Sequence, residues 1–138
     1  MVGGAQPINT GSDPRVLGFV DNEAYEYNMT HLAVMFYHSR ENRHLHYHPI
    51  EAIKNGMPLI YMANGMLDEL GGKDLPGRCK TIAEARRKIA RIFNGDKEFI
   101  QDVVKSQAIL LQPFTYEYCR TQWDAAFVSI DKDIARNK

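Results

Sequence analysis

Residues 81–95 read TIAEARRKIARIFNG. Their apolar positions recur every three or four residues, which is the period of an amphipathic α-helix. Thr81 and Glu84 form a capping box, in which the threonine hydroxyl accepts from the Glu84 amide and the carboxylate accepts from the Thr81 amide. Gly95 follows the last apolar position and suits the left-handed residue after a helix. This stretch therefore predicts a capped helix between Thr81 and Gly95.

Helical patterns also precede this stretch. Asp21 or Asn22 can cap a helix. Its apolar stripe is spaced at four, three and four residues: Tyr25, Met29, Leu32 and Phe36. Further along, Pro49 fits the first turn of a short helix that stops at Gly56. Between these residues, the segment from Arg40 to His48 breaks the helical period and is expected to be a connection.

Residues 58–72 allow two interpretations. Pro58 can open a helix in which the apolar residues keep a helical register up to Gly71 and Gly72. The apolar run 59–62 can instead form a short strand, because short apolar runs are ambiguous between the two structures. The sequence leaves both alternatives open.

Two more helices are expected after Gly95. Asp96 can cap the first of them, which Pro113 closes. The second begins at Thr115 or, through another capping box, at Thr121. Its apolar stripe is spaced at 4, 3, 1, 3 and 4 residues: Cys119, Trp123, Ala126, Phe127, Ile130 and Ile134. Because elements close in sequence tend to pack together, we expect one core made by the two most apolar stripes: Trp123, Phe127 and Ile130 with Ile89 and Phe93.

The fold class that these patterns predict is all-α, or mainly α. Residues 21–138 are expected to form a single domain of about five or six helices. Residues 1–20 hold four of the ten glycines and two of the six prolines, and they show no apolar stripe. This composition predicts an extended N-terminal arm. An arm without a stripe of its own is expected to be ordered only by contact with another chain.

Composition narrows the class of protein. The 138 residues carry no formal net charge, so the net charge does not indicate binding to nucleic acid or to anionic lipid. Residues 1–70 hold four basic and eight acidic side chains, whereas residues 71–138 hold thirteen basic and nine acidic ones. Cys79 and Cys119 form no metal or disulfide motif and are expected to be thiols in a reducing, intracellular compartment. No signal peptide, no membrane span and no cofactor motif is recognisable in the sequence.

The histidine-rich segment offers a metal-binding alternative. His44, His46 and His48 form a His-x-His-x-His pattern. In an extended chain the three imidazoles share one side, and in a helix His44 and His48 meet across one turn. Either arrangement can present nitrogen ligands to Zn²⁺, Ni²⁺ or Cu²⁺. The simpler interpretation is a polar loop that is rich in histidine.

The same segment offers a catalytic alternative. Arg43 and His48 have an Arg-x4-His spacing, and a polar residue follows the arginine. This spacing resembles the short motif of HEPN ribonucleases, which are small helical proteins that cut RNA without a metal. The resemblance implies that Arg43 would steady the phosphate and that His48 would act as general acid or base.

Two surfaces are candidates for contact with a protein partner. The first is a basic cluster on and before the helix at 81–95. The second is the aromatic-rich stretch near residue 116, because tyrosine and tryptophan are frequent anchors in interfaces. No aromatic residue lies between the basic ones, so binding of nucleic acid is not expected. The expected partner-binding residues are Arg78, Lys80, Arg87, Arg91, Tyr116 and Tyr118.

These observations favour a protein that works by contact rather than by catalysis. No phosphate-binding glycine loop, nucleophile motif or zinc-protease motif is recognisable. Near-zero net charge favours association. We therefore expect a non-catalytic helical subunit that acts as a homo-oligomer or as a small part of a larger assembly. The two alternatives are the HEPN-like ribonuclease that uses Arg43 and His48, and the metal-binding protein that uses the histidine run.

Overall fold

The structure is a computed structural model that describes residues 2–3 and 11–136. About 60% of the chain is helical, so the expectation of a mainly helical protein is confirmed. The elements follow one another in this order: β1 (Val2–Gly3), β2 (Val16–Gly18), α1 (Asn22–His31), β3 (Met35–Tyr37), α2 (His48–Lys54), β4 (Leu59–Met62), η1 (Asp68–Gly72), β5 (Arg78–Cys79), α3 (Ile82–Phe93), α4 (Lys97–Ser106), η2 (Gln107–Phe114) and α5 (Tyr116–Arg136).

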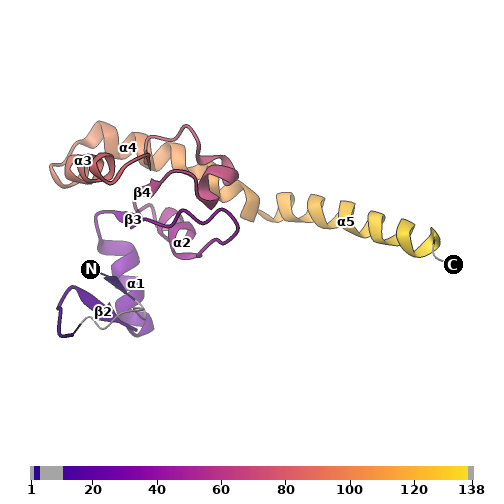
Figure 1. The fold of residues 1–138 in the computed structure, drawn as a ribbon, viewed down its shortest axis with the longest axis horizontal. Helices are drawn as coiled ribbons and strands as arrows, with labels where there is room; N and C mark the ends of the chain where they lie inside the picture. The colour runs from indigo at the N-terminus through magenta and orange to yellow at the C-terminus, as the bar shows by residue number, and fades with distance from the viewer. Residues whose placement is uncertain (1, 4–10, 137–138) are drawn as a thin grey trace.

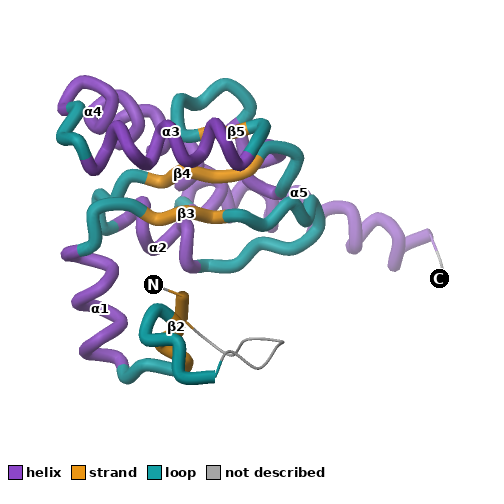
Figure 2. The backbone as a smooth tube through the Cα atoms, turned by 60° about the vertical axis from the view of Figure 1, so that its left-hand side comes forward, coloured by secondary structure: helices purple, strands orange, loops and turns teal. Residues whose placement is uncertain are grey.

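A small parallel sheet lies at the centre of the body, and the expectation of an all-α fold was wrong on this point (Figure 2). The strand order is β3-β4-β5, and both pairs are parallel. Met35 is paired with Leu59, and Met62 with Cys79. β1 and β2 form a separate parallel pair. Strands of two to four residues are too short for a clear alternating pattern, and for this reason the sequence showed only the ambiguity at 59–62.

Helices cover both faces of the sheet, and the central strand β4 is buried throughout. Ile60 and Met62 face the apolar side chains of α3 and α4, including Ile92 and Phe99. Leu59 and Tyr61 face the opposite layer, which α2, η1 and η2 build. Successive side chains of a strand point to opposite faces, so four apolar residues in a row supply two cores.

A buried glutamine fixes the start of β4. The Gln107 side chain accepts from the Leu59 amide at 2.9 Å and donates to the Met57 carbonyl at 3.0 Å. It therefore satisfies backbone groups that the short strand leaves without a partner. This contact joins segments that are fifty residues apart and helps the chain at 59–62 to form a strand rather than a helix.

Three of the predicted helix starts are confirmed. The side chains of Asp21, Thr81 and Asp96 each accept from the backbone amide three residues later. The capping box at Thr81 differs in one detail, because the Glu84 carboxylate accepts from the Lys80 amide rather than from Thr81. Gly95 has φ 74°, the left-handed conformation predicted for it.

The first predicted stripe is divided between two elements. α1 ends at His31, with Leu32 as its C-cap, and Phe36 lies in β3. Met29 is buried against Ala52 and Met57, whereas Phe36 is exposed. Backbone pairing with β4 decides the structure of residues 35–37, and the helical spacing of Phe36 had no structural meaning.

The core predicted between the last helix and α3 was wrong. Figure 1 shows α5 leaving the body as a single projecting helix. Within the described part of the chain, no residue of α5 is buried. Phe93 is also exposed, and Ile89 packs against the sheet instead. Among the described residues, both faces of the sheet are packed against α2, α3, α4, η1 and η2, so the sheet does not need α5 as a cover.

The predicted arm can be compared with the structure only in part. Residues 1 and 4–10 lie outside the described residues. β2 pairs with β1, and Leu17, Phe19 and Val20 face α1 across a cavity of about 410 Å³. This part of the predicted arm therefore lies against its own chain, and contact of the arm with another chain stays a prediction.

Candidate functional site

A row of exposed, large apolar side chains lies along α5. We call it the α5 stripe, and it consists of Cys119, Trp123, Ala126, Phe127, Ile130 and Ile134. Trp123 is 63% exposed, Phe127 57%, Ile130 50% and Ile134 53%. The Trp123 and Phe127 rings stack at 5.8 Å between centroids. Together these side chains form a continuous apolar strip along one side of the helix.

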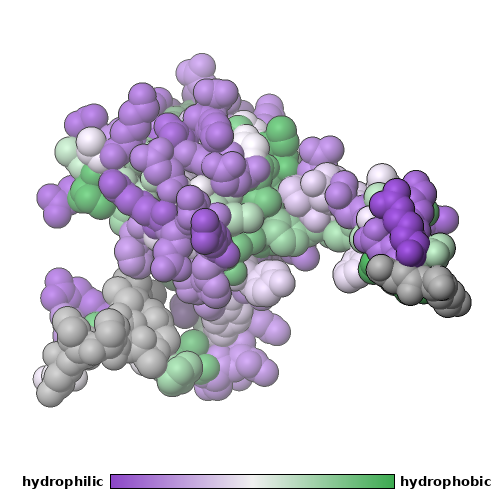
Figure 3. Space-filling view, turned by 45° about the vertical axis from the view of Figure 1, so that its right-hand side comes forward, coloured by the Kyte–Doolittle hydropathy of each residue, from purple (hydrophilic) through white to green (hydrophobic). Residues whose placement is uncertain are grey.

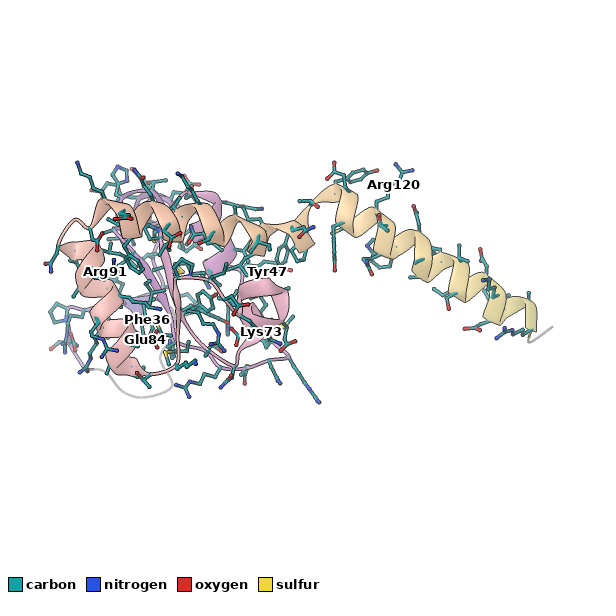
Figure 4. The ribbon with its side chains drawn as sticks, turned by 90° about the horizontal axis from the view of Figure 1, so that it is seen from above. Phe36, Tyr47, Lys73, Glu84, Arg91 and Arg120 are labelled. Atoms are coloured by element: carbon teal, nitrogen blue, oxygen red, sulfur yellow. The ribbon has the colours of Figure 1, made fainter. Side chains whose placement is uncertain are left out.

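α5 meets the body near its first turn. The Thr115 hydroxyl accepts from the Tyr118 amide at 3.3 Å, so the helix begins where the first of the two predicted starts placed it. The principal contact of α5 with the body is with η2. Figure 3 shows the helix as an arm that stands apart from the body, and Figure 4 shows side chains, Arg120 among them, projecting from it into open space.

An apolar strip of this size is unusual on the surface of a monomer. Single exposed apolar residues are common, whereas contiguous ones usually mark contact surfaces. An isolated helix also gains little from its own hydrogen bonds and normally needs packing of an apolar face. The expected contact residues Tyr116 and Tyr118 are both exposed at the base of α5, where the helix leaves the body.

A second candidate site lies at the carboxyl edge of the parallel sheet. In open parallel sheets with helices on both faces, ligands usually bind at this edge. Arg40 follows β3, Asn64 follows β4 and Lys80 follows β5, and all three are exposed. The Arg40 guanidinium donates to the Lys80 carbonyl at 3.4 Å, so the Arg40 side chain reaches from the loop after β3 to the end of β5.

The turn after β4 is tightly built. Asn64 has φ 66°, which is rare for a residue other than glycine. A Cβ at Gly65 would lie 2.9 Å from the Ser39 carbonyl oxygen, so only glycine allows the two loops to approach this closely. The Met66 amide also donates to the Glu41 carbonyl at 2.9 Å. The loops after β3 and β4 therefore hold one another in place.

A buried ion pair supports this edge. Arg78 makes two hydrogen bonds to the Asp68 carboxylate, at 2.8 and 2.7 Å. The Asp68 side chain is 2% exposed and that of Arg78 is 17% exposed. Asp68 also accepts from the Asn64 amide at 2.9 Å. The hydrogen bonds from Arg78 lower the pKa of the Asp68 carboxyl, and the carboxylate raises the pKa of Arg78.

The structure separates the four basic residues that the sequence grouped as partner-binding. Arg78 is held by Asp68, and Arg91 is paired with Asp96 at 2.8 Å and lies over the Phe99 ring. Lys80 and Arg87 are exposed. Figure 4 shows Arg91 on α3 at the end of the molecule opposite α5. The basic cluster and the aromatic stretch are therefore two distant surfaces.

The three histidines of the His-x-His-x-His run are all exposed, on the connection before α2 and at its first residue. The His44 and His46 rings lie 4.6 Å apart, and the Tyr37 hydroxyl is 3.1 Å from Nδ1 of His46. His48 lies instead beside Tyr25, 5.9 Å away between ring centroids. Among the described residues, no three His, Cys, Asp or Glu side chains are placed to hold a metal ion.

The two residues of the HEPN-like alternative lie on different elements. Arg43 is in the connection after β3, and His48 is the first residue of α2. The parallel sheet is not part of the small helical architecture that this resemblance implies. Catalysis by Arg43 and His48 stays an untested alternative.

Two features of the site were not recognisable as such in the sequence. Asp68 was an ordinary acidic residue in a predicted helix, and Asn64 an ordinary polar one. A polar residue directly after a short apolar run was the available signal, since parallel strands carry functional groups at their carboxyl ends.

Comparison of the chain with protein-family models, curated proteins and solved structures finds no match.

Proposed function

We propose that this protein works by association with another polypeptide through the α5 stripe. The observation that carries the proposal is that the stripe is continuous, aromatic and exposed along a projecting 21-residue helix. An amphipathic helix of this kind docks its apolar face into a groove or against another helix. Trp123 and Phe127 are the expected anchors, because large aromatic side chains dominate the energy of interfaces.

The proposal predicts that polar substitutions in the stripe release the chain from its complexes. Trp123→Gln with Phe127→Gln removes both anchors while keeping residues that are compatible with a helix. The measurement is the apparent size of the protein by gel filtration, in extract of its source cells and after purification. The double variant should elute at the size of a 15.8 kDa monomer, whereas the unchanged protein should elute earlier in at least one of the two settings.

Val128→Gln provides the matched control. Val128 is 53% exposed on the same helix, and its direction is about 150° from the centre of the stripe at 100° per residue. This variant should elute like the unchanged protein. If the double variant and the unchanged protein elute identically in both settings, the α5 stripe is not a contact surface.

A second candidate function is binding of a phosphate-bearing small molecule at the carboxyl edge of the sheet. The observation that favours it is the placement of two exposed cations, Arg40 and Lys80, at the ends of parallel strands. Arginine and lysine are the usual partners of phosphate groups, and this edge is the usual position of such ligands.

This second candidate predicts binding that depends on both cations. Inorganic pyrophosphate and a nucleoside diphosphate are suitable probes in isothermal titration calorimetry. Arg40→Ala with Lys80→Ala should weaken binding at least tenfold, whereas Lys97→Ala, at the start of α4, should leave it unchanged. Equal binding by both variants would show that any affinity is nonspecific attraction to positive charge.

A further inference from the structure

We infer that the partner of the α5 stripe is the α5 stripe of a second copy of this chain, packed against it in antiparallel orientation. This inference rests on the proposed function, and it adds the identity of the partner and its geometry. It is carried by the symmetry of the stripe about a point midway between Ala126 and Phe127.

The spacing of the stripe reads the same in both directions. Going out from the midpoint, Ala126 and Phe127 come first, then Trp123 and Ile130, and then Cys119 and Ile134. At 100° per residue, all six directions lie within about 50° of the stripe's centre. A two-fold axis through the midpoint therefore places the whole stripe of one helix against the whole stripe of the other. Such closed two-fold pairing is the commonest form of protein association.

Large apolar side chains of the two copies meet in this arrangement. Phe127 and Ala126 lie about 50° to either side of the stripe's centre, so the two-fold axis places Phe127 beside Phe127 of the second copy, and Trp123 lies opposite Ile130. Both large rings are now more than half exposed, so pairing would remove much of their apolar surface from water.

The charges beside the stripe are complementary. Arg120 and Asp131 lie on the same side of the stripe, about 70° and about 90° from its centre. The two-fold axis brings Arg120 of each copy to within about 3 Å, along the helix axis, of Asp131 of the other. Within one chain, Arg120 makes only a long, exposed contact with Asp124, at 3.7 Å. The pairing therefore adds two attractive contacts at the rim of the stripe.

The bodies of the two copies do not obstruct this arrangement. α5 is about 32 Å long, and Figure 1 shows it pointing away from the body. In the antiparallel pair, the base of one α5 lies beside the tip of the other. Each body is then at an opposite end of the helix pair.

The native cysteine of the stripe allows a direct test of this geometry. Cys119 lies opposite Ile134 of the second copy in the antiparallel pair, but about 22 Å along the axis from the other Cys119. A disulfide needs Cα atoms within about 7 Å of each other. Ile134→Cys should therefore give a covalent dimer under mild oxidation with oxidised glutathione, and the unchanged protein should not.

Two control variants complete the experiment, which is read on non-reducing gels with purified protein. Ile134→Cys combined with Cys119→Ser should give no covalent dimer, because the introduced sulfurs then lie far apart. Val128→Cys, directed away from the stripe, should also give none. Before oxidation, sedimentation equilibrium of the unchanged protein should show about twice the 15.8 kDa chain mass.

Each contrary result has a distinct meaning. A covalent dimer of the unchanged protein through Cys119 would indicate parallel pairing and overturn the inference. A purified chain that stays monomeric at all concentrations would also overturn it. If such a monomer still elutes in a larger complex in cell extract, and loses that complex on Trp123→Gln with Phe127→Gln, the proposed function stands with a different partner.

Discussion

Arg78→Ala should lower the free energy of unfolding by about 3–5 kcal/mol, because it leaves the carboxylate of Asp68 buried without its partner. Asp68 is almost completely enclosed, and of the groups that lower its pKa the Asn64 amide and the more distant charge of Lys73 would remain. The loss should be visible in urea unfolding at neutral pH as a lower midpoint with an unchanged slope. A loss below about 1 kcal/mol would contradict the burial of this pair.

The effect of Arg78→Ala should depend on pH in a defined direction. The pKa of Asp68 is lowered in the folded protein, mainly by the hydrogen bonds from Arg78. A carboxyl with a lowered pKa stabilises the fold at pH values above its unfolded pKa, near 4, and this contribution is lost as the pH falls through the folded pKa. The difference between Arg78→Ala and the unchanged protein should therefore be largest at neutral pH and shrink below about pH 4.

Arg120→Ala is the matched control for this experiment. Arg120 also pairs with an aspartate, but both side chains are about two-thirds exposed and the contact with Asp124 is 3.7 Å long. Exposed pairs on a helix contribute about 0.3–0.5 kcal/mol. At concentrations where the chain is monomeric, Arg120→Ala should change the free energy of unfolding by no more than this. The difference between the two losses in free energy of unfolding measures how strongly the cost of removing one partner of an ion pair depends on burial.

The sequence predicted the helical elements well where capping residues marked them. Asp21, Thr81 and Asp96 each begin a helix as expected, because a cap is a contact between residues three apart. The same local reasoning could not place β3, since that strand exists only through its pairing with β4. Pairing between strands more than twenty residues apart leaves no local periodic signal when each strand has three or four residues.

The candidate sites could be predicted only to the extent that they depend on one element. The α5 stripe was recognised as apolar and aromatic from its spacing, but it was assigned to the core. Amphipathic spacing indicates that a helix covers something, and it does not say whether the covered surface belongs to the same chain. The sheet edge could not be predicted, because Arg40 and Lys80 are forty residues apart and the sheet alone brings them together.

Leu110→Ala and Phe127→Ala together measure the difference between an apolar side chain that is buried in its own chain and one that is exposed on a surface. Leu110 in η2 is fully buried among side chains of α2 and β4, so its replacement should cost about 2–5 kcal/mol at any protein concentration. Phe127 is 57% exposed in one chain, so its replacement should change the free energy of unfolding of the monomer by no more than about 0.5 kcal/mol.

The dependence of the melting temperature on protein concentration should also differ between the two variants. If two α5 stripes pair, dissociation accompanies unfolding, and the melting temperature of the unchanged protein rises with concentration. Phe127→Ala should remove most of that rise, whereas Leu110→Ala should lower the whole curve and leave its slope unchanged. Differential scanning calorimetry over a hundredfold range of concentration makes the comparison. A loss of several kcal/mol from Phe127→Ala in the dilute limit would place the ring in the core of its own chain, as its helical spacing first suggested.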